Sequence, residues 1–265
     1  MIPITEIFAS IQGEGVFSGE PCFFIRVSGC NLRCVFKGSI CDTPYSSFKP
    51  EKDTSIQSVE DLIKAFKQMH EEFPRIKSVV ITGGEPLLYG KELKEFLYAL
   101  CDYDWFDHSW NITVETNGTM PMIEDPDNPL FDIFYSISPK LSTSVAAKPG
   151  VYGGYNVTAN IIKNHDKKRI NIENLADMIC SNNVQLKFVY SGPESVYEIL
   201  DICKKLEEQG VDPERLNKCI MLMPEGVTND QLQTNREKIV EICTKFGWHY
   251  TDRLQIIIWG DKRGV

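Results

Sequence analysis

Beyond residue 50, the pattern of apolar and polar positions alternates between helical spacing and short strand-like segments. Helical spacing covers residues 58–72, where Ser58 and Asp61 are placed as a capping box, and the region near 229–246. Two more helices are expected from residues that share an inward face: Leu93, Phe96, Leu97 and Leu100 in one, and Val196, Ile199, Leu200, Cys203 and Leu206 in the other.

Short segments between these helices, rich in apolar and β-branched residues, predict strands. They are KSVVIT (77–82), NITVETNG (111–118), FDIFYSISPK (131–140), VQLKFVY (184–190), KCIMLMP (218–224) and RLQIIIW (253–259). Strands that alternate with helices predict parallel strands joined by right-handed crossovers, in a barrel or an open doubly wound sheet. In both folds, active residues lie at the carboxyl ends of the strands.

Two stretches depart from this alternation. Residues 141–175 are rich in Gly, Ser, Asn and Lys, and they predict an irregular insertion or lid, or a solvated surface loop. EDPDNP (124–129) predicts a turn. Since the chain shows no internal repeat and a barrel takes ~250 residues, we expect residues 1–265 to form a single domain.

The charge of the chain narrows its possible partners. It has 37 acidic and 28 basic residues and a formal charge of −9, which argues against binding a nucleic-acid backbone. No apolar run approaches the ~18 residues of a membrane span, and MIPITEIF lacks the basic start of a secretory signal. The sequence therefore predicts a cytoplasmic protein that binds neither nucleic acid nor membrane.

The nine cysteines need an explanation, because an odd number in such a chain argues against a disulfide framework. Three of them, Cys30, Cys34 and Cys41, fall within twelve residues. Cys22 is ambiguous. The remaining five lie in or near apolar segments and are expected to be buried thiols: Cys101, Cys180, Cys203, Cys219 and Cys243.

The cysteine trio has three possible explanations. Three thiolates on one loop can hold three irons of a cubane cluster and leave the fourth iron open to a ligand. A structural zinc site is a second possibility, although such sites close with four ligands and no fourth lies near the trio. Chance placement of buried cysteines is the third.

Other motifs follow the predicted strands, on the edge where the carboxyl ends meet. GGEP (83–86) has two glycines that let the backbone approach a ligand closely. ETNGT (115–119) and SPK (138–140) also stand at strand ends, although each alone is a common turn. Their convergence on one edge with the cysteine trio favours a single site.

These motifs resemble those of the radical S-adenosylmethionine (SAM) superfamily and, within it, the 7-carboxy-7-deazaguanine synthase family. The matching segments are IFASIQGEGVFSG (7–19), FFIRVSGCNLRC (23–34), CDT (41–43), ITGGEP (81–86), ETNGT, SPK and WGDKRGV (259–265). The resemblance implies an α/β fold, a partial (β/α) TIM-like barrel of the radical SAM type.

The resemblance also implies an activity. Members of this family are carbon–nitrogen lyases that use a [4Fe–4S] cluster, SAM and Mg²⁺ to convert 6-carboxy-5,6,7,8-tetrahydropterin to 7-carboxy-7-deazaguanine. Ammonia is lost, and the product enters queuosine and other 7-deazapurine pathways. An electron donor such as flavodoxin or ferredoxin and a homodimeric state are implied too.

The matched positions carry the family's site roles to this chain. The implied cluster ligands are Cys30, Cys34 and Cys41. The implied substrate-binding residues are Ile11, Gln12, Gly13, Glu14, Arg26, Thr82 and Val265, with Arg26 on the substrate carboxylate. The implied SAM-binding residues are Ile40, Cys41, Asp42, Gly84, Ser138, Pro139 and Lys140. Thr43 is the implied magnesium ligand. Residues 250–265 are expected to form a strand and a tail that closes the site.

The chain departs from the family pattern at two places. Six residues separate Cys34 from Cys41, where the superfamily has two, so the extra residues must loop out if Cys41 is a ligand. Gln255 stands where the family often has histidine, which keeps hydrogen bonding but loses titration near neutral pH.

Two other functions remain as alternatives to this reading. One is a radical SAM activase that abstracts hydrogen from a protein glycine. The other is a non-catalytic iron–sulfur or zinc module.

Overall fold

The computed structural model describes residues 2–53, 55–56, 58–123 and 132–265, so the turn expected at 124–129 lies outside the described residues. Within these residues, eight strands form the main sheet, in the order β1-β2-β5-β6-β7-β10-β11-β12. Their bounds are β1 (Ile4–Ile11), β2 (Pro21–Val27), β5 (Ser78–Gly83), β6 (Asn111–Thr116), β7 (Ile133–Ile137), β10 (Val184–Tyr190), β11 (Ile220–Pro224) and β12 (His249–Tyr250). β1 runs antiparallel to β2, and all the other neighbours are parallel.

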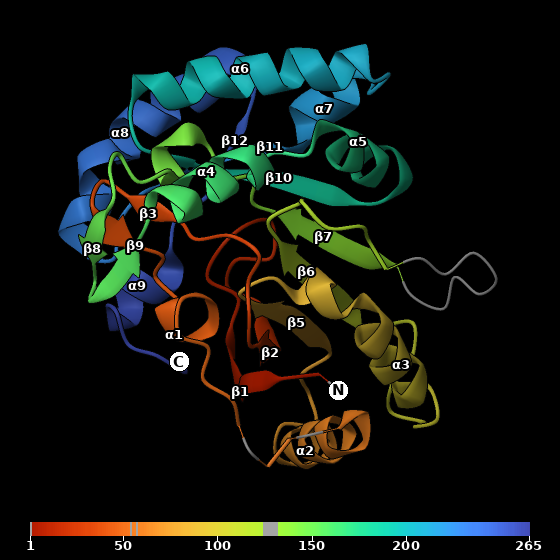
Figure 1. Ribbon diagram of the computed structural model, residues 1–265. Coiled ribbons are helices and arrows are strands. Elements are labelled where there is room, and N and C mark those ends of the chain that lie inside the picture. The colour runs from red at the N-terminus through yellow and green to blue at the C-terminus, as the bar shows by residue number, and fades with distance from the viewer. Residues whose placement is uncertain (1, 54, 57, 124–131) are drawn as a thin grey trace.

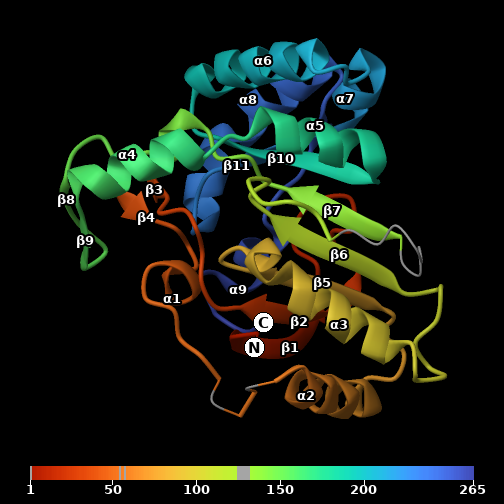
Figure 2. The ribbon, with the colours of Figure 1, turned by 45° about the vertical axis from the view of Figure 1, so that its right-hand side comes forward.

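Helices connect the parallel strands and cover the outer face of the curved sheet (Figures 1 and 2). Their bounds are α2 (Val59–Glu72), η1 (Pro86–Tyr89), α3 (Gly90–Leu100), α5 (Ile172–Ser181), α6 (Pro193–Glu208), α7 (Pro213–Cys219) and α8 (Asn229–Phe246). The fold is a mostly parallel α/β architecture, a partial (β/α) barrel with β1 and β12 at its two ends. This confirms the predicted fold class.

Local sequence signals account for most of these elements. Ser58 caps α2 by accepting a hydrogen bond from the Asp61 backbone N–H at 3.1 Å, as the capping box predicts. The inward faces of α2 and α3 and the strand side chains join one large apolar core that runs from Ile2 to Trp248. On α6 the predicted face is wrong at Leu200, which is 39 % exposed, whereas Ile202 is buried.

The last predicted strand is wrong. Residues Leu254–Trp259 form a short helix, α9, although three successive isoleucines favour a strand. Leu254 N–H donates to the carbonyl of Gly13, which turns the chain away from the sheet after Thr251–Arg253. Only Ile256 of the isoleucine run is buried, so tertiary contacts override the local propensity here.

The segment 141–175 is more ordered than the sequence predicts. It contains η2 (Ser142–Ser144), an antiparallel hairpin of β8 (Gly150–Tyr152) and β9 (Tyr155–Val157), α4 (Ala159–Lys168) and the start of α5. The β8–β9 hairpin and α4 lie on one side of the molecule with β3 (Val35–Phe36), β4 (Ser39–Ile40) and α1 (Pro44–Ser47), as Figure 2 shows.

All nine cysteines lie in the described part of the chain and are free thiols. The expectation of burial is wrong for Cys101 and Cys180, which are exposed, because each stands on the outer side at a helix end. Cys22 and Cys243 are buried. No helix among the described residues is both long and apolar enough to span a membrane.

Candidate active site

A cavity of about 590 Å³ opens at the carboxyl ends of the central strands. This volume lies in the usual range for small-molecule sites. All but one of the site residues predicted from the sequence line it: Ile11, Gln12, Gly13, Glu14, Arg26, Cys30, Cys34, Ile40, Cys41, Asp42, Thr43, Thr82, Gly84, Ser138, Lys140 and Val265.

Pro139 is the predicted site residue that does not line this cavity; it is buried beneath it. Ser138 and Lys140 stand two positions apart and both face the cavity, where Lys140 Nζ donates to Ser138 Oγ at 2.9 Å. In an extended chain the residue between them points to the opposite side. The geometry therefore separates Pro139 from its two neighbours.

A β-hairpin accommodates the six-residue gap between Cys34 and Cys41. β3 and β4 pair antiparallel, with Val35 opposite Ile40, and Lys37 and Gly38 form the two-residue turn. Both turn residues have positive φ, 42° and 91°, as a type I′ turn requires. Cys41 N–H then donates to the Cys34 carbonyl at 3.0 Å, so the hairpin returns the chain beside Cys34.

The hairpin packs against the ordered elements of the 141–175 segment. Val35 joins Val157 and Ala146 in a small apolar cluster. Ile40 also contacts this cluster and lies so close to Gly153 that a Cβ there would meet Ile40 Cδ1 at 2.7 Å. The inserted residues are thus a packed part of the fold.

The turn between Cys30 and Cys34 is held by polar side chains. The Arg33 guanidinium donates to the carbonyls of Cys30 at 2.6 Å and Leu32 at 2.7 Å. Asn31 Oδ1 accepts from Asn117 Nδ2 at 2.9 Å. Asn117 belongs to the ETNGT motif, which explains why that motif accompanies the cysteine loop.

Thr119 of the same motif supports Asn31 as well, since its Oγ1 accepts from Asn31 Nδ2 at 2.7 Å. GGEP, another motif at a strand end, is bonded to ETNGT through Glu85. Its buried carboxylate accepts from Thr116 Oγ1 and from Asn117 N–H, both at 2.7 Å. Burial raises the pKa of Glu85 despite these bonds.

Gly84 shows why GGEP needs its second glycine. A Cβ at this position would stand 2.2 Å from the carbonyl oxygen of Gly29 and 2.7 Å from that of Ser46. The close backbone approach places GGEP directly against the residue before Cys30.

The three predicted cluster ligands fit thiolate ligation to separate irons. Cys30, Cys34 and Cys41 share one cavity, and burial raises the pKa of Cys30 to about 12 and raises the pKa values of the other two. Buried neutral thiols release their protons when a metal binds. Among the described residues, no three Cys, His, Asp or Glu side chains are arranged around a single ion. A cluster needs no such point, because each thiolate takes its own iron.

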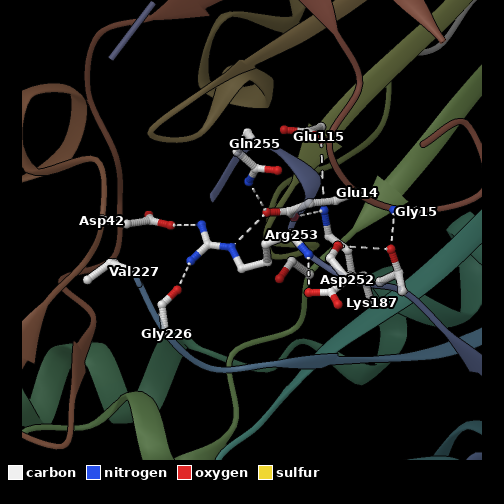
Figure 3. A network of polar contacts seen from close by, with 12 residues as sticks. Glu14, Gly15, Asp42, Glu115, Lys187, Gly226, Val227, Asp252, Arg253 and Gln255 are labelled. Atoms are coloured by element: carbon white, nitrogen blue, oxygen red, sulfur yellow. Dashed lines mark hydrogen bonds and ion pairs between the residues drawn. The ribbon is translucent and has the colours of Figure 1, made fainter. Parts of the chain in front are cut away.

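The opposite end of the cavity carries a network of buried charges (Figure 3). Glu14 Oε2 accepts from Lys187 Nζ at 2.5 Å, and Glu14 Oε1 accepts from Arg253 Nε at 3.0 Å. Arg253 also donates to Asp42 Oδ2 at 2.5 Å and to the carbonyl of Gly226. Arg253 thereby connects the predicted substrate loop to the residue that follows Cys41.

The network keeps its members ionised although they are buried. Burial alone would raise the pKa of Glu14, but the charges of Lys187 and Arg253 outweigh it and hold the pKa well below its usual range. Burial likewise opposes the charge of Lys187, yet Glu14 and Glu115 raise its pKa. The pKa of Asp42 is lowered by Arg253 in the same way.

Glu115 joins two predicted substrate residues to this network. Its carboxylate accepts from Gln12 Nε2 at 3.2 Å and from Thr82 Oγ1 at 2.8 Å, and it lies 3.9 Å from Lys187 Nζ. Sequence reasoning did not assign Glu115, Lys187 or Arg253 to the site. The available signal was a lysine inside the predicted strand VQLKFVY, since a buried lysine needs a counter-charge.

The C-terminal tail is held at the edge of the sheet. Arg26 Nε and Arg263 Nε both donate to Glu6, at 2.7 and 2.8 Å. The Arg263 guanidinium also lies 3.8 Å from the ring centroid of Tyr45. These contacts place Val265 in the wall of the cavity, close to the predicted carboxylate-binding Arg26.

Gln255 takes part in the network from the first turn of α9. Its Nε2 donates to Glu14 Oε1 at 2.8 Å. Its Oε1 is buried and accepts no hydrogen bond from the described residues. Gln255 Oε1 packs against the backbone of Gly13, in the space that a Cβ at that position would occupy.

Comparison of the sequence and the fold with known proteins identifies the class of enzyme to which this site belongs. Residues 24–128 match the family model described as the Radical SAM superfamily. The crystal structure of QueE from Escherichia coli has a similar fold, with a TM-score of 0.57 and 22 % identity over 96 % of this chain and 94 % of that chain. Fold, cysteine loop and family model together define a radical SAM protein, for which a [4Fe–4S] cluster and SAM are the cofactors.

Relatives that match nearly the whole chain identify its family. The chain is 35 % identical to the 7-carboxy-7-deazaguanine synthase of Halobacterium salinarum over 98 % of its own length and 91 % of that protein's. It is 34 % identical to the synthase of Rhodopirellula baltica, covering 99 % of this chain and 88 % of that protein. The chain belongs to the 7-carboxy-7-deazaguanine synthase family.

Proposed function

We propose that this chain is a carbon–nitrogen lyase that converts 6-carboxy-5,6,7,8-tetrahydropterin to 7-carboxy-7-deazaguanine with loss of ammonia, in queuosine or 7-deazapurine biosynthesis. The observation that carries the proposal is the convergence of the cysteine trio, Gln12, Glu14 and Arg26 on one cavity. A cluster module without a substrate would have no use for the last three residues.

When bound, the cluster and SAM supply hydrogen-atom abstraction by a 5′-deoxyadenosyl radical. The thiolates of Cys30, Cys34 and Cys41 would hold the cluster. The SAM contacts fall to the residues beside them that line the cavity: Ile40, Cys41, Asp42, Gly84, Ser138 and Lys140. Buried Pro139 supports the backbone between the last two.

The substrate end is already arranged before a ligand enters. Ionised Glu14 accepts N–H donors, and Gln12 offers an amide for the 2-amino-4-oxo edge of the pterin. Arg26 has its Nε on Glu6, and its terminal nitrogens contact no acceptor within the described residues. Those nitrogens suit the substrate carboxylate, which a guanidinium binds in a bidentate manner. Thr82 and Val265 complete the pocket wall.

Gln255 replaces the family's histidine as a hydrogen-bonding residue. Its Nε2 donates to Glu14 Oε1 and holds that carboxylate in place. Because an amide does not titrate near neutral pH, this position orients Glu14 without moving a proton. Activity is therefore expected in spite of the substitution.

Thr43 is proposed as the magnesium ligand. It stands at the N-cap position of α1, but its hydroxyl does not cap that helix and lies 3.4 Å from Cys41 Sγ, in the cavity wall. A neutral hydroxyl suits an oxygen shell shared with substrate and water. Thr43→Val should weaken the magnesium dependence of turnover and leave the iron content unchanged; equal loss of both would contradict the assignment.

The electron donor is proposed to be an acidic protein such as flavodoxin or ferredoxin. α4 contacts the cysteine loop through His165 and exposes Lys163, Lys167 and Lys168 on a chain whose net charge is negative. A basic face next to the cluster site would steer an acidic donor. Reduction by such a donor should slow as ionic strength rises.

The remaining proposals concern the whole molecule. The continuous core supports a single domain over 1–265, in which 141–175 borders the site and the tail at 250–265 closes it. The free thiols support a cytoplasmic location. A homodimer is proposed from family membership, and sedimentation would test it.

Anaerobic reconstitution with iron and sulfide, then assay with the carboxytetrahydropterin, SAM, Mg²⁺ and a reductant, tests the proposal. We expect 7-carboxy-7-deazaguanine by mass spectrometry. A fully loaded cluster that forms no such product would refute it. SAM cleavage only with a partner protein would favour a glycyl-radical activase, and metal content without SAM cleavage would favour a non-catalytic module.

A further inference from the structure

His165 of α4 reaches the turn between the first two cysteines from outside the cavity. The Arg33 backbone N–H, one residue before Cys34, donates to His165 Nδ1 at 3.2 Å. His165 Nε2 lies 3.0 Å from Ser144 Oγ of η2. The two ring nitrogens of this buried imidazole, 3 % exposed, thus contact the cysteine turn on one side and η2 on the other.

The hydrogen bonds around this imidazole determine its tautomer. The Ser144 hydroxyl donates its proton to the Leu141 carbonyl at 2.7 Å. It can therefore only accept from His165 Nε2, which must carry the ring proton. Nδ1 is then the acceptor, as the Arg33 N–H requires. The direction of every bond in the chain from Leu141 to Arg33 is consistent with a neutral ring.

The surroundings favour the neutral ring independently. Burial, together with the nearby charges of Arg169 and Lys140, lowers the pKa of His165 to about 4. Protonation would place a second N–H against the Arg33 amide, which has no acceptor to offer. The imidazole is thus a fixed acceptor for the loop near neutral pH.

The cysteine turn is held from two opposite sides. From the sheet, Asn117 and Thr119 at the end of β6 hold Asn31. From the 141–175 segment, His165 holds Arg33. Since Cys30 and Cys34 bracket these two residues, both supports act on the spacing of the two thiols.

We propose that His165 is a positioning residue that holds the Cys30–Cys34 turn in the conformation that binds the cluster, through its hydrogen bond to the Arg33 backbone. Ser144 acts one step further out by fixing which ring nitrogen accepts. The inference rests on the proposed cluster site and deepens it. Groups that orient metal ligands typically change metal retention by about 10–100-fold when removed.

The test measures cluster retention directly. His165→Phe, His165→Asn and Ser144→Ala are reconstituted anaerobically, and iron per chain and the loss of visible cluster absorbance to a chelator are followed. We expect about tenfold faster loss in His165→Phe. His165→Asn should stay close to wild type, because its Oδ1 stands where Nδ1 was. Ser144→Ala should fall between the two.

His70→Phe is the matched control. His70 is also buried, on α2, and contacts the Trp105 ring rather than the cysteine turn. It should release iron at the wild-type rate. Melting of the iron-free proteins separates a fold defect from a cluster defect.

Three outcomes of the iron-loss measurements would overturn the proposed role of His165. Equal iron loss from the Phe and Asn variants, or from His165→Phe and wild type, would overturn it. If His165→Phe does not fold, Ser144→Ala decides, and a wild-type rate of iron loss would overturn it. A wild-type protein that takes up no four-iron cluster would instead refute the proposed function.

Discussion

At the end of the cavity with Cys30, Cys34 and Cys41, the residues are neutral thiols on a backbone held by hydrogen bonds and a hairpin. At the end with Glu14, Lys187 and Arg253, the residues are charged and contact one another directly. We call these the cofactor end and the substrate end. One end depends on backbone shape and the other on charge balance.

The difference follows from what each end must bind. Buried neutral thiols cost little while no metal is present, and they become ligands by losing protons. Buried ions cost several kcal/mol each unless they are paired. At the substrate end the ions are already paired with one another before a ligand binds. Its donors and acceptors therefore need no reorganisation when a polar substrate enters.

Cys41→Ala should have the largest effect, and at the cofactor end alone. Loss of one of three ligands should abolish the cluster and lower product formation by about 10⁴-fold or more, the scale expected when an essential group is removed. Iron analysis and the turnover assay measure this. The free energy of unfolding of the iron-free protein should stay near wild type, because Cys41 is only half-buried.

Cys101→Ala is the control for that variant, since Cys101 is exposed and lies at the end of α3. It should keep both iron and activity. Four irons and SAM cleavage retained in Cys41→Ala would mean that another cysteine closes the cluster and that the hairpin does not deliver a ligand.

Lys187→Met should damage the substrate end. It removes the nearer counter-charge of Glu14 and the one facing Glu115, and breaking a buried pair typically costs about 3–5 kcal/mol. We expect a loss of that order in the free energy of unfolding by urea, with a raised KM for the pterin. The iron content of the reconstituted protein should be unchanged.

Lys205→Met provides the matched control, because Lys205 pairs with Asp201 on the surface of α6. Exposed pairs contribute about 0–1 kcal/mol. If the two lysine variants lose similar stability, the buried network does not behave as a charge-balanced unit.

Glu14→Gln should sharpen the contrast through pH. The folded-state pKa of Glu14 lies below its ordinary value of 4.5, so its ionised form stabilises the fold above pH 4.5. That contribution is lost as pH falls below 4.5. Wild type should therefore exceed Glu14→Gln in unfolding free energy at pH 7, and the gap should narrow by up to about 1.4 kcal/mol per pH unit below 4.5.

Unfolding of the iron-free proteins at a series of pH values measures the gap. The buried histidines His70 and His165 titrate in both proteins and cancel in the difference. A gap that is constant from pH 7 to 3 would show that Glu14 is not held ionised by Lys187 and Arg253.

The cofactor end was more predictable from sequence than the substrate end. Its ligands lie within twelve residues, and the six-residue gap between Cys34 and Cys41 indicated that the chain must loop out there. The sequence did not show that this loop is a hairpin packed on Gly153, because that contact joins residues over a hundred positions apart.

The substrate end required tertiary information. Glu14, Lys187 and Arg253 are far apart in the chain, and nothing local to Arg253 indicates a partner at position 14. The same contact explains the error at α9. Residues 251–254 bond to the Gln12–Gly15 loop, and the isoleucines that follow adopt a helix against their local propensity.

Gly38→Ala should have the smallest effect and test whether backbone shape governs the cofactor end. Gly38 and Gly210 have φ values of 91° and 90°, and a Cβ at either meets no atom within 4 Å. Alanine should therefore cost about 1 kcal/mol of unfolding free energy at both positions. Only Gly38→Ala strains the turn that returns Cys41 beside Cys34, so only it should also release iron faster to a chelator. Equal iron release from the two variants would mean that the hairpin turn does not set the position of Cys41.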